Sequence, residues 1–253
     1  MDILIYIIGG ILAGVATGLI GLSAAVVIAP LFATVFGMDP YVAVGIALAS
    51  DVFASAISSV TYIKNKNIDI KHSNVLAITI ITFAIIGSLL SKDMDPNNMN
   101  SILNIFVVLL GIRFLVYPVK DPKPASFKKF GTFVILTSLF FGAIIGMISG
   151  YFGGGGGLSI LAVLVMLYAY DIKKAVGTSV FIMTFTALVG ASTHIIMRGT
   201  FWIPLLITSA AAMFGANLAS RYANKINTKT LNRVIGIFLV VYGIILLILH
   251  FSG

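Results

Sequence analysis

The chain has 253 residues, of which 59% are hydrophobic and only 9% are charged, whereas a soluble domain carries about a quarter charged residues. This composition excludes a soluble globular protein and favours a membrane protein. The net charge of +8 would suggest nucleic acid binding in a soluble chain, but here the basic residues stand in short loops between apolar segments, as at membrane edges. We therefore expect the lipid bilayer as a partner, and no nucleic acid.

Metal and cofactor chemistry is not expected. The chain has no cysteine, and its three histidines are far apart in the sequence, so neither thiolate ligands nor an HExxH-like pair is present. The first apolar run has no basic segment before it and no small-residue cleavage site after it, so we expect it to be retained as structure.

Long uninterrupted apolar runs predict an all-α polytopic membrane protein, because barrel strands would alternate in polarity. Eight helical segments are expected in chain order, and the proline-rich stretch from Pro118 to Pro124 divides them into two sets of four. The segments are 3–36, 40–63, 72–91, 98–118, 129–170, 172–197, 201–221 and 228–251.

Two of these segments are too long for a single crossing. At 1.5 Å per residue, the segment 3–36 would run about 50 Å and the segment 129–170 about 60 Å, against a hydrocarbon core of about 30 Å. Each holds a glycine cluster, Gly14 to Gly21 in the first and Gly146 to Gly157 in the second. Each is therefore expected to tilt strongly, break or turn back, and the glycines favour a break.

The two glycine clusters share a register. An offset of 132 places Gly10, Gly14, Gly18 and Gly21 on Gly142, Gly146, Gly150 and Gly153, and Asp39 on Asp171. We therefore predict two pseudo-symmetric repeats, 1–118 and 129–253, joined by a loop at 119–128. Four crossings per half would make the repeats parallel, whereas a turned-back first segment would invert them. The basic loops favour neither orientation, so the sidedness stays open.

The run of five glycines from Gly153 to Gly157 predicts a broken helix, since each glycine costs about 1 kcal/mol of helix propensity. The second half of a broken helix begins with free N–H groups and a positive dipole end, which suit an anion. Gly154, Gly155, Gly156 and Gly157 are thus candidates for binding an anionic group. The first-half counterpart, Gly21 to Ala25, offers the Ser23 hydroxyl, which either donates to a ligand or bonds back to a helix carbonyl.

Further candidates lie in the segment 172–197 and just after it. The hydroxyls of Thr178 and Ser179 either line a cavity or make interhelical hydrogen bonds. His194 and Arg198 are one turn apart and could attract an anion, or they anchor the helix end at the interface beside Trp202.

Asp51 is the one acidic residue deep inside a predicted span, with apolar runs on both sides. A carboxylate at that depth costs several kcal/mol unless it is paired, hydrated or protonated, and such residues are functional candidates. Asp51 either carries a coupling proton or cation or forms a buried pair with a basic group.

The sequence resembles the TauE/SafE family of sulfite and organosulfonate exporters, which are four-plus-four-helix membrane proteins with a glycine-rich motif opening each half. The resemblance rests on the stretch from Gly146 to Gly157, on Ala175 to Ser179 and on Arg198-Gly199, with weaker echoes at Gly14 to Pro30 and Ala43 to Gly45. It implies a site at the repeat interface that includes Gly154 to Gly157, Thr178 and Ser179. In the first half this chain has Ser23-Ala24-Ala25 and Ile46-Ala47, where the family usually has glycines and a Thr-Ser pair.

Together these features predict a multi-pass secondary transporter of the cell membrane, not an enzyme, that carries a small anion. Sulfite, thiosulfate and organosulfonates are the substrates that the resemblance implies. The alternatives are an anion channel, a carrier of a small carboxylate and a helper subunit. The binding residues would be Ser23, the glycines, Thr178, Ser179 and Arg198, with Asp51 and His194 in coupling. The sequence allows a homo-oligomer as well as a monomer.

Overall fold

The computed structural model describes residues 2–91, 132–153 and 156–227, together with scattered positions between 229 and 244. Its elements in these ranges are all helices, which confirms the all-α prediction. Six of them, α1, α3, α4, α6, α8 and α9, are long and apolar enough to cross a membrane. The helices are α1 (Asp2–Ile20), α2 (Ala25–Val35), α3 (Pro40–Lys64), α4 (Ile70–Leu90), α6 (Thr132–Phe152), α7 (Gly156–Met166), α8 (Ile172–Arg198) and α9 (Trp202–Lys225).

Four of the predicted segments correspond to α3, α4, α8 and α9 with ends that differ by a few residues. Each of the two overlong segments is broken into two helices, α1 with α2 and α6 with α7, as the glycines indicated. The predicted helix 98–118, the connecting loop 119–128 and most of the segment 228–251 lie outside the described residues.

At both breaks the chain turns back on itself. The Tyr6 ring near the start of α1 lies 5.3 Å from the Phe32 ring and 4.9 Å from the Phe36 ring near the end of α2. In α6 the Ser138 hydroxyl lies 2.7 Å from the hydroxyl of Tyr168, just after α7. The short helices α2 and α7 therefore run antiparallel to α1 and α6. Each short helix ends at the same end of the bundle at which the preceding long helix begins.

A glycine in the left-handed region makes each turn. Gly21 has a φ of +72° and Gly153 a φ of +67°, values that glycine adopts at no steric cost and other residues rarely adopt. The two positions are 132 residues apart, the offset found in the sequence.

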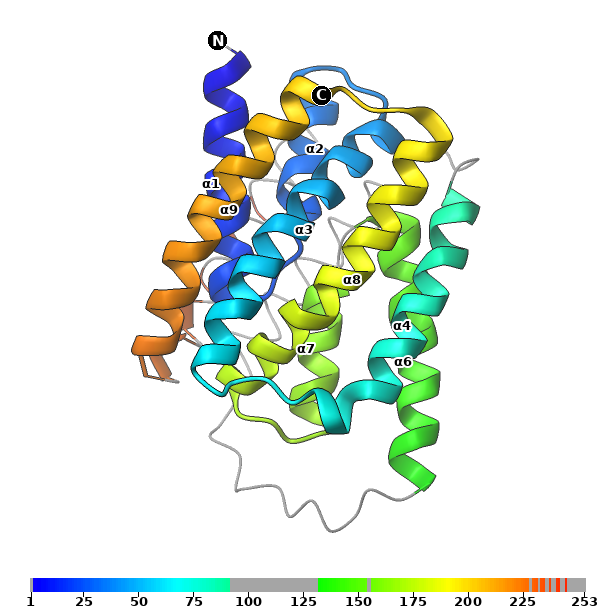
Figure 1. The fold of residues 1–253 in the computed structure, drawn as a ribbon, viewed down its shortest axis with the longest axis vertical. Coiled ribbons are helices and arrows are strands. Elements are labelled where there is room, and N and C mark those ends of the chain that lie inside the picture. Colours follow the sequence, from blue (N-terminus) through cyan, green and yellow to red (C-terminus); the bar gives the residue numbers. More distant parts are fainter. Residues whose placement is uncertain are drawn as a thin grey trace.

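The span-length helices pack in pairs (Figure 1). α1 runs parallel to α9, with Gly14 against Ala212, and α4 runs parallel to α6, with Gly150 against Ala84. Glycine at these crossings lets the backbones approach closely, as in other membrane helix pairs. α3 and α8 run antiparallel between the two pairs, because Gly45 near the start of α3 meets His194 near the end of α8.

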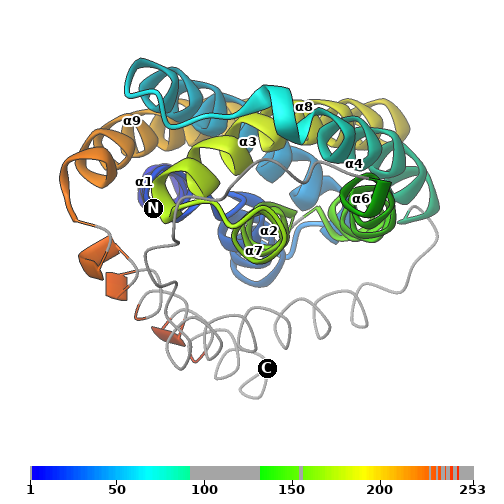
Figure 2. The same ribbon diagram turned by 90° about the horizontal axis from the view of Figure 1, so that it is seen from below.

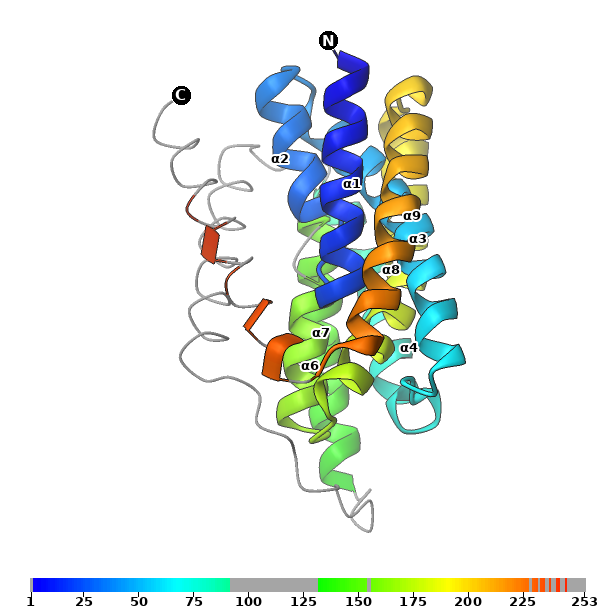
Figure 3. The same ribbon diagram turned by 90° about the vertical axis from the view of Figure 1, so that its left-hand side faces the viewer.

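Figure 2 shows two rows of helices, one with α9, α3, α8 and α4 and the other with α1, α2, α7 and α6. In Figure 3 the short helices α2 and α7 lie one above the other in the middle of the bundle. The two breaks lie against each other, since a Cβ on Gly157, the second residue of α7, would meet the carbonyl oxygen of Gly21 in the turn before α2. Both short helices thus begin beside this contact.

Aspartates cap the helices at the bundle ends. Asp39 accepts hydrogen bonds from the Tyr41 and Val42 N–H groups at the start of α3, and Asp171 accepts one from Lys174 N–H at the start of α8. Their side chains satisfy backbone donors that have no partner within the helix. These caps fix where both central helices begin.

Candidate functional site

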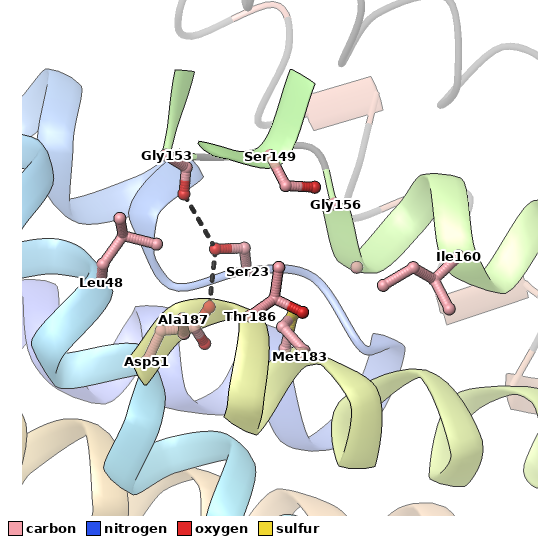
Figure 4. Close-up of a pocket in the computed structure, with 11 residues that line it drawn as sticks. Ser23, Leu48, Asp51, Ser149, Gly153, Gly156, Ile160, Met183, Thr186 and Ala187 are labelled. Carbon is pink, nitrogen blue, oxygen red and sulfur yellow. Dashed lines mark hydrogen bonds between the residues drawn. The ribbon is translucent and has the colours of Figure 1, made fainter. Parts of the chain in front are cut away.

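The breaks enclose a small pocket with both polar and apolar lining residues (Figure 4). Its polar lining consists of the Ser23, Ser149 and Thr186 hydroxyls, the Asp51 carboxylate and the backbone of three glycines. The lining residues are Ser23, Leu48, Asp51, Ser149, Gly153, Gly156, Gly157, Ile160, Met183, Thr186 and Ala187. The pocket therefore collects groups from both breaks and from the central helices α3 and α8.

Ser23 connects the two breaks. Its hydroxyl lies 2.6 Å from a carboxylate oxygen of Asp51 and 3.4 Å from the carbonyl oxygen of Gly153 in the second break, as the dashed lines in Figure 4 show. A hydroxyl has one proton to donate, so it serves one of these acceptors at a time. The shorter distance gives that proton to Asp51.

Asp51 is fully buried and is held by donors from the first break. It accepts from the Ser23 hydroxyl and from the backbone N–H of Ala24. The Thr17 hydroxyl lies 3.4 Å from it, but the carbonyl oxygen of Leu22 is the nearer acceptor of the Thr17 proton, at 2.8 Å. Among the described residues no basic side chain pairs with it, so a buried ion pair, one of the two predicted roles, is not found there. Its partners are hydroxyls and a helix N-terminus.

The hydroxyls of Ser149 and Thr186 donate to carbonyl oxygens one turn back in their own helices, at 2.6 and 2.8 Å. Their oxygen lone pairs remain available to a group in the pocket. Gly156 begins α7 directly against Ser149, so a larger residue there would displace the hydroxyl. The second break is thus a glycine backbone with hydroxyls beside it.

The pocket is closed in this conformation. Its cavity volume is about 10 Å³, roughly the room for one water molecule. A ligand larger than a water molecule therefore needs the surrounding helices to separate before it can enter.

Four of the residues predicted for binding or coupling come together here. Ser23, Asp51, Gly156 and Gly157 all line the pocket. Gly154 and Gly155 lie outside the described residues.

Thr178 and Ser179 lie nearer the end of the bundle where α8 begins. The Thr178 hydroxyl accepts the backbone N–H of Asp69 at 3.0 Å, and Ser179 donates to the Val176 carbonyl at 2.9 Å. Neither residue lines the pocket, although Ser179 packs behind it against Gly21. In this conformation Thr178 holds the loop between α3 and α4 against α8.

His194 and Arg198 lie at the opposite end of α8. His194 is fully buried, stacks on Tyr41 at 3.9 Å between ring centroids and places Nδ1 3.1 Å from the Tyr41 carbonyl oxygen. Arg198 forms a half-exposed ion pair with Asp39 at 3.0 Å and lies over the Tyr41 ring. These contacts join α8 to the start of α3.

The loop between α3 and α4 is tied down at the other end. Asp69 lies 2.9 Å from His72 and 3.1 Å from Lys174, and the Asn67 amide donates to the Asn224 side chain at 2.7 Å. Burial raises the pKa of the Asp69 carboxyl, but the hydrogen bonds from His72 and Lys174 outweigh it and hold this pKa below its usual value. These bonds join α4, α8 and α9 below the pocket.

The sequence interpretation missed both further hydroxyls of the pocket, Ser149 and Thr186, and the apolar lining residues Leu48, Ile160, Met183 and Ala187. Ser149 and Thr186 are single hydroxyls in apolar helices and are not distinctive alone. The offset of 132 pairs Ser149 with Thr17, whose hydroxyl lies 3.4 Å from Asp51 in the first break, so the repeat could have identified Ser149. In the described ranges no three His, Asp or Glu side chains gather into a metal site.

Comparison with known proteins identifies the family. A family model described as sulfite exporter TauE/SafE matches residues 6–246. The chain belongs to this family. The TauE/SafE match covers both breaks and the eight described helices except for the first four residues of α1.

Its relatives are similar along nearly their whole length. The chain is 26% identical over 263 positions to "Probable membrane transporter protein YunE" of Bacillus subtilis, with 96% of each chain covered. It is 27% identical over 259 positions to a probable membrane transporter protein of Methanocaldococcus jannaschii, covering 96% of this chain and 95% of the other. No solved structure matches at a significant level. This TauE/SafE chain is therefore a multi-pass membrane transporter, which confirms that expectation and the expectation that it is not an enzyme.

Proposed function

We propose that this transporter moves a small anion, with sulfite, thiosulfate or an organosulfonate as first candidates and a small carboxylate as the second. The observation that carries the proposal is the start of α7 at a pocket that also holds the Ser23, Ser149 and Thr186 hydroxyls. Helix N-termini present free N–H groups and about half a positive charge each, so an anion is the ligand they favour.

The binding groups of the proposal belong mainly to the second break. Gly154 to Gly157 would offer backbone N–H groups, of which the structure describes those of Gly156 and Gly157, and the Ser149 and Thr186 hydroxyls lie beside them. Glycine suits this role because an oxyanion can approach a backbone that has no Cβ. Ser23 would complete the site from the first break.

The proposed transport cycle uses two inverted repeats. Equivalent helices of the two halves run in opposite directions, α1 opposite to α6 and α3 opposite to α8. Each break supplies a helix that starts at the centre and ends on one side. Rocking of one repeat against the other would open the pocket first to one side and then to the other. The contacts of Arg198 with Asp39 and of Asp69 with Lys174 would then close the two ends in turn.

Asp51 is proposed to couple transport to a proton. It lines the same pocket as the glycine break, and an ionised carboxylate repels an anion strongly where water is excluded. Anion binding would therefore favour a protonated Asp51. Protonation would also free the Ser23 hydroxyl to donate to the anion. His194 contacts Tyr41 and not the pocket. We therefore propose that His194 helps to close its end of the bundle and takes no part in coupling.

The basic end of the bundle is proposed to face the cytoplasm. The α3–α4 loop, the start of α8 and the end of α9 meet at one end, as their mutual contacts require. In residues 2–91, 132–153 and 156–227, that end carries Lys64, Lys66, Lys71, Lys173, Lys174, Arg221 and Lys225, whereas Arg198 is the one Lys or Arg at the other. The positive-inside rule then places the start of α1 outside.

The direct test is uptake of radiolabelled sulfite into proteoliposomes, with and without an imposed pH gradient. We expect saturable uptake that a gradient drives and that Thr186→Val reduces. Thr193→Val is the matched control, because Thr193 lies on the same helix with the same one-turn hydrogen bond but outside the pocket. Asp51→Asn should abolish the gradient dependence. Uptake that neither Thr186→Val nor Asp51→Asn changes would refute the site, and unitary currents in bilayer recordings would indicate a channel.

A further inference from the structure

The first break already holds an anion, and that anion is part of the chain. The carboxylate of Asp51 accepts hydrogen bonds from the Ser23 hydroxyl, at 2.6 Å, and from the Ala24 N–H, and the Thr17 hydroxyl lies 3.4 Å away. Because α2 begins at Ala25, this carboxylate occupies the N-terminus of α2. It is fully buried, and no charged side chain of the described residues competes for it.

The second break has the same geometry as the first, but the residue that corresponds to Asp51 is different. The offset of 132 relates Gly21 to Gly153, both in the left-handed region, and Thr17 to Ser149, both donating one turn back to a carbonyl. The same offset relates Asp51 to Met183.

Met183 occupies the place of the carboxylate. It is buried and lines the pocket, and its sulfur would lie 2.7 Å from a Cβ placed on Gly157 at the start of α7. A thioether is at most a weak acceptor, so the residue that corresponds to Asp51 supplies no anion to the N-terminus of α7.

We infer that Asp51 is an internal substitute for substrate, which fills the anion site of the first break, and that Met183 leaves the equivalent site of the second break to the transported anion. This inference rests on the proposed function and deepens it. It makes position 183 a specificity-determining position: an uncharged side chain there admits an oxyanion, and an acidic one excludes it. It also fixes the number of bound anions at one per chain.

The exchange also accounts for the unequal composition of the two breaks. A side chain on the neighbouring helix reaches the first break, so Ala24 and Ala25 can have Cβ atoms there. A free anion has to reach the second break directly, and glycines stand at the equivalent positions 156 and 157.

The test compares Met183→Asp with Met183→Asn, two side chains of nearly equal size that differ in charge. Binding of radiolabelled sulfite to the purified full-length chain is measured by equilibrium dialysis at neutral pH, after gel filtration has shown a monodisperse protein. We expect Met183→Asp to weaken sulfite binding by at least about tenfold relative to Met183→Asn, since tenfold corresponds to only about 1.4 kcal/mol. Equal affinity of the two variants would overturn the inference.

A buried aspartate at position 183 can also prevent folding, so a second variant keeps the inference testable. Asp51→Ser removes the internal anion and keeps a small polar side chain at the first break. Because the N-terminus of α2 is then without its carboxylate, we expect sulfite to bind this variant without uptake of a proton by the protein, so that its affinity for sulfite falls less with rising pH than that of the wild type. An equally steep fall would contradict the inference. Absence of sulfite binding to the wild-type chain would instead count against the proposed substrate class, which separates failure of the proposed function from failure of this inference.

Discussion

The packing of α1 on α9 and of α4 on α6 can be tested with single methyl groups. A Cβ added at Gly18 would lie 2.5 Å from the Ala216 carbonyl oxygen, and one added at Gly146 would lie 2.5 Å from the Ile80 carbonyl oxygen. Ordinary van der Waals contact begins at 3.4 Å, so each helix pair would have to separate by about 0.9 Å. The atoms met are backbone, which cannot rotate away.

The expected cost follows from two opposing effects. Overpacking of a well-packed contact costs about 1–3 kcal/mol, and replacing glycine by alanine in a helix recovers about 1 kcal/mol. Because the added methyl groups meet backbone atoms, the overpacking cost should lie at the upper end of this range, about 2–3 kcal/mol, so Gly18→Ala and Gly146→Ala should each lose about 1–2 kcal/mol. For a protein of this size each kcal/mol lowers the melting temperature by about 2–4 °C, so a fall of about 2–8 °C is expected.

Thermal unfolding of the purified protein, followed by fluorescence-detected gel filtration, measures this fall. Gly45→Ala is the matched control, because its Cβ would lie 3.1 Å from a side-chain atom of His194, which a shift of a few tenths of an ångström relieves. We expect its melting temperature to stay close to that of the wild type. If Gly18→Ala and Gly146→Ala melt at or above the wild-type temperature, these helix pairs are not packed as described.

Three further predictions concern the bundle ends. The chain has no cysteine, so we expect Met38→Cys, and not Lys66→Cys, to react with an impermeant maleimide on intact cells; the reverse would invert the proposed orientation. Thr178→Val leaves the Asp69 N–H without its acceptor, which costs about 1–3 kcal/mol and should lower the melting temperature; unchanged stability with weaker sulfite binding would make Thr178 a substrate ligand. The lowered pKa of Asp69 means that its carboxylate stabilises the fold fully above the unfolded value of about 3.9 and less as the pH falls below it. Asp69→Asn should accordingly melt below the wild type at neutral pH, and the difference should shrink in acid; a difference independent of pH would contradict this account.

The predictable part of the fold came from apolar length and from glycine. A helix of apolar residues that is longer than the bilayer is thick must tilt or be interrupted. The glycine clusters that contain Gly21 and Gly153 indicated the positions of the two interruptions. The direction of the chain after each interruption was not predictable, because a bent helix and a hairpin need the same glycines. The contacts of Tyr6 with Phe32 and Phe36 show that the first segment forms a hairpin. Such contacts depend on tertiary packing, so the sequence pattern alone could not predict them.

The candidate site was only partly predictable, because depth in the bundle cannot be read from residue type. Thr178 and Thr186 lie on the same helix, eight residues and therefore about 12 Å apart. The first holds a loop at the end of the bundle, and the second lines the central pocket. The glycine motif and Asp51 were the exceptions. Five consecutive glycines are unfavourable in a continuous helix, and a carboxylate inside an apolar helix is unfavourable in lipid, so both patterns indicate a site inside the bundle.

The charges at the centre indicate how a proton and an anion would move together. Two helix N-termini contribute about +0.5 each, and an ionised Asp51 contributes −1, so the pocket without a ligand is close to neutral. Entry of a monovalent anion would leave an uncompensated negative charge in a region that excludes water, where such a charge is strongly disfavoured. Protonation of Asp51 restores the balance with one proton for each anion. In the proposed cycle the centre of the protein would then be nearly neutral in both the loaded and the empty state. We therefore expect uptake of a monovalent anion to be accompanied by one proton and to move little net charge.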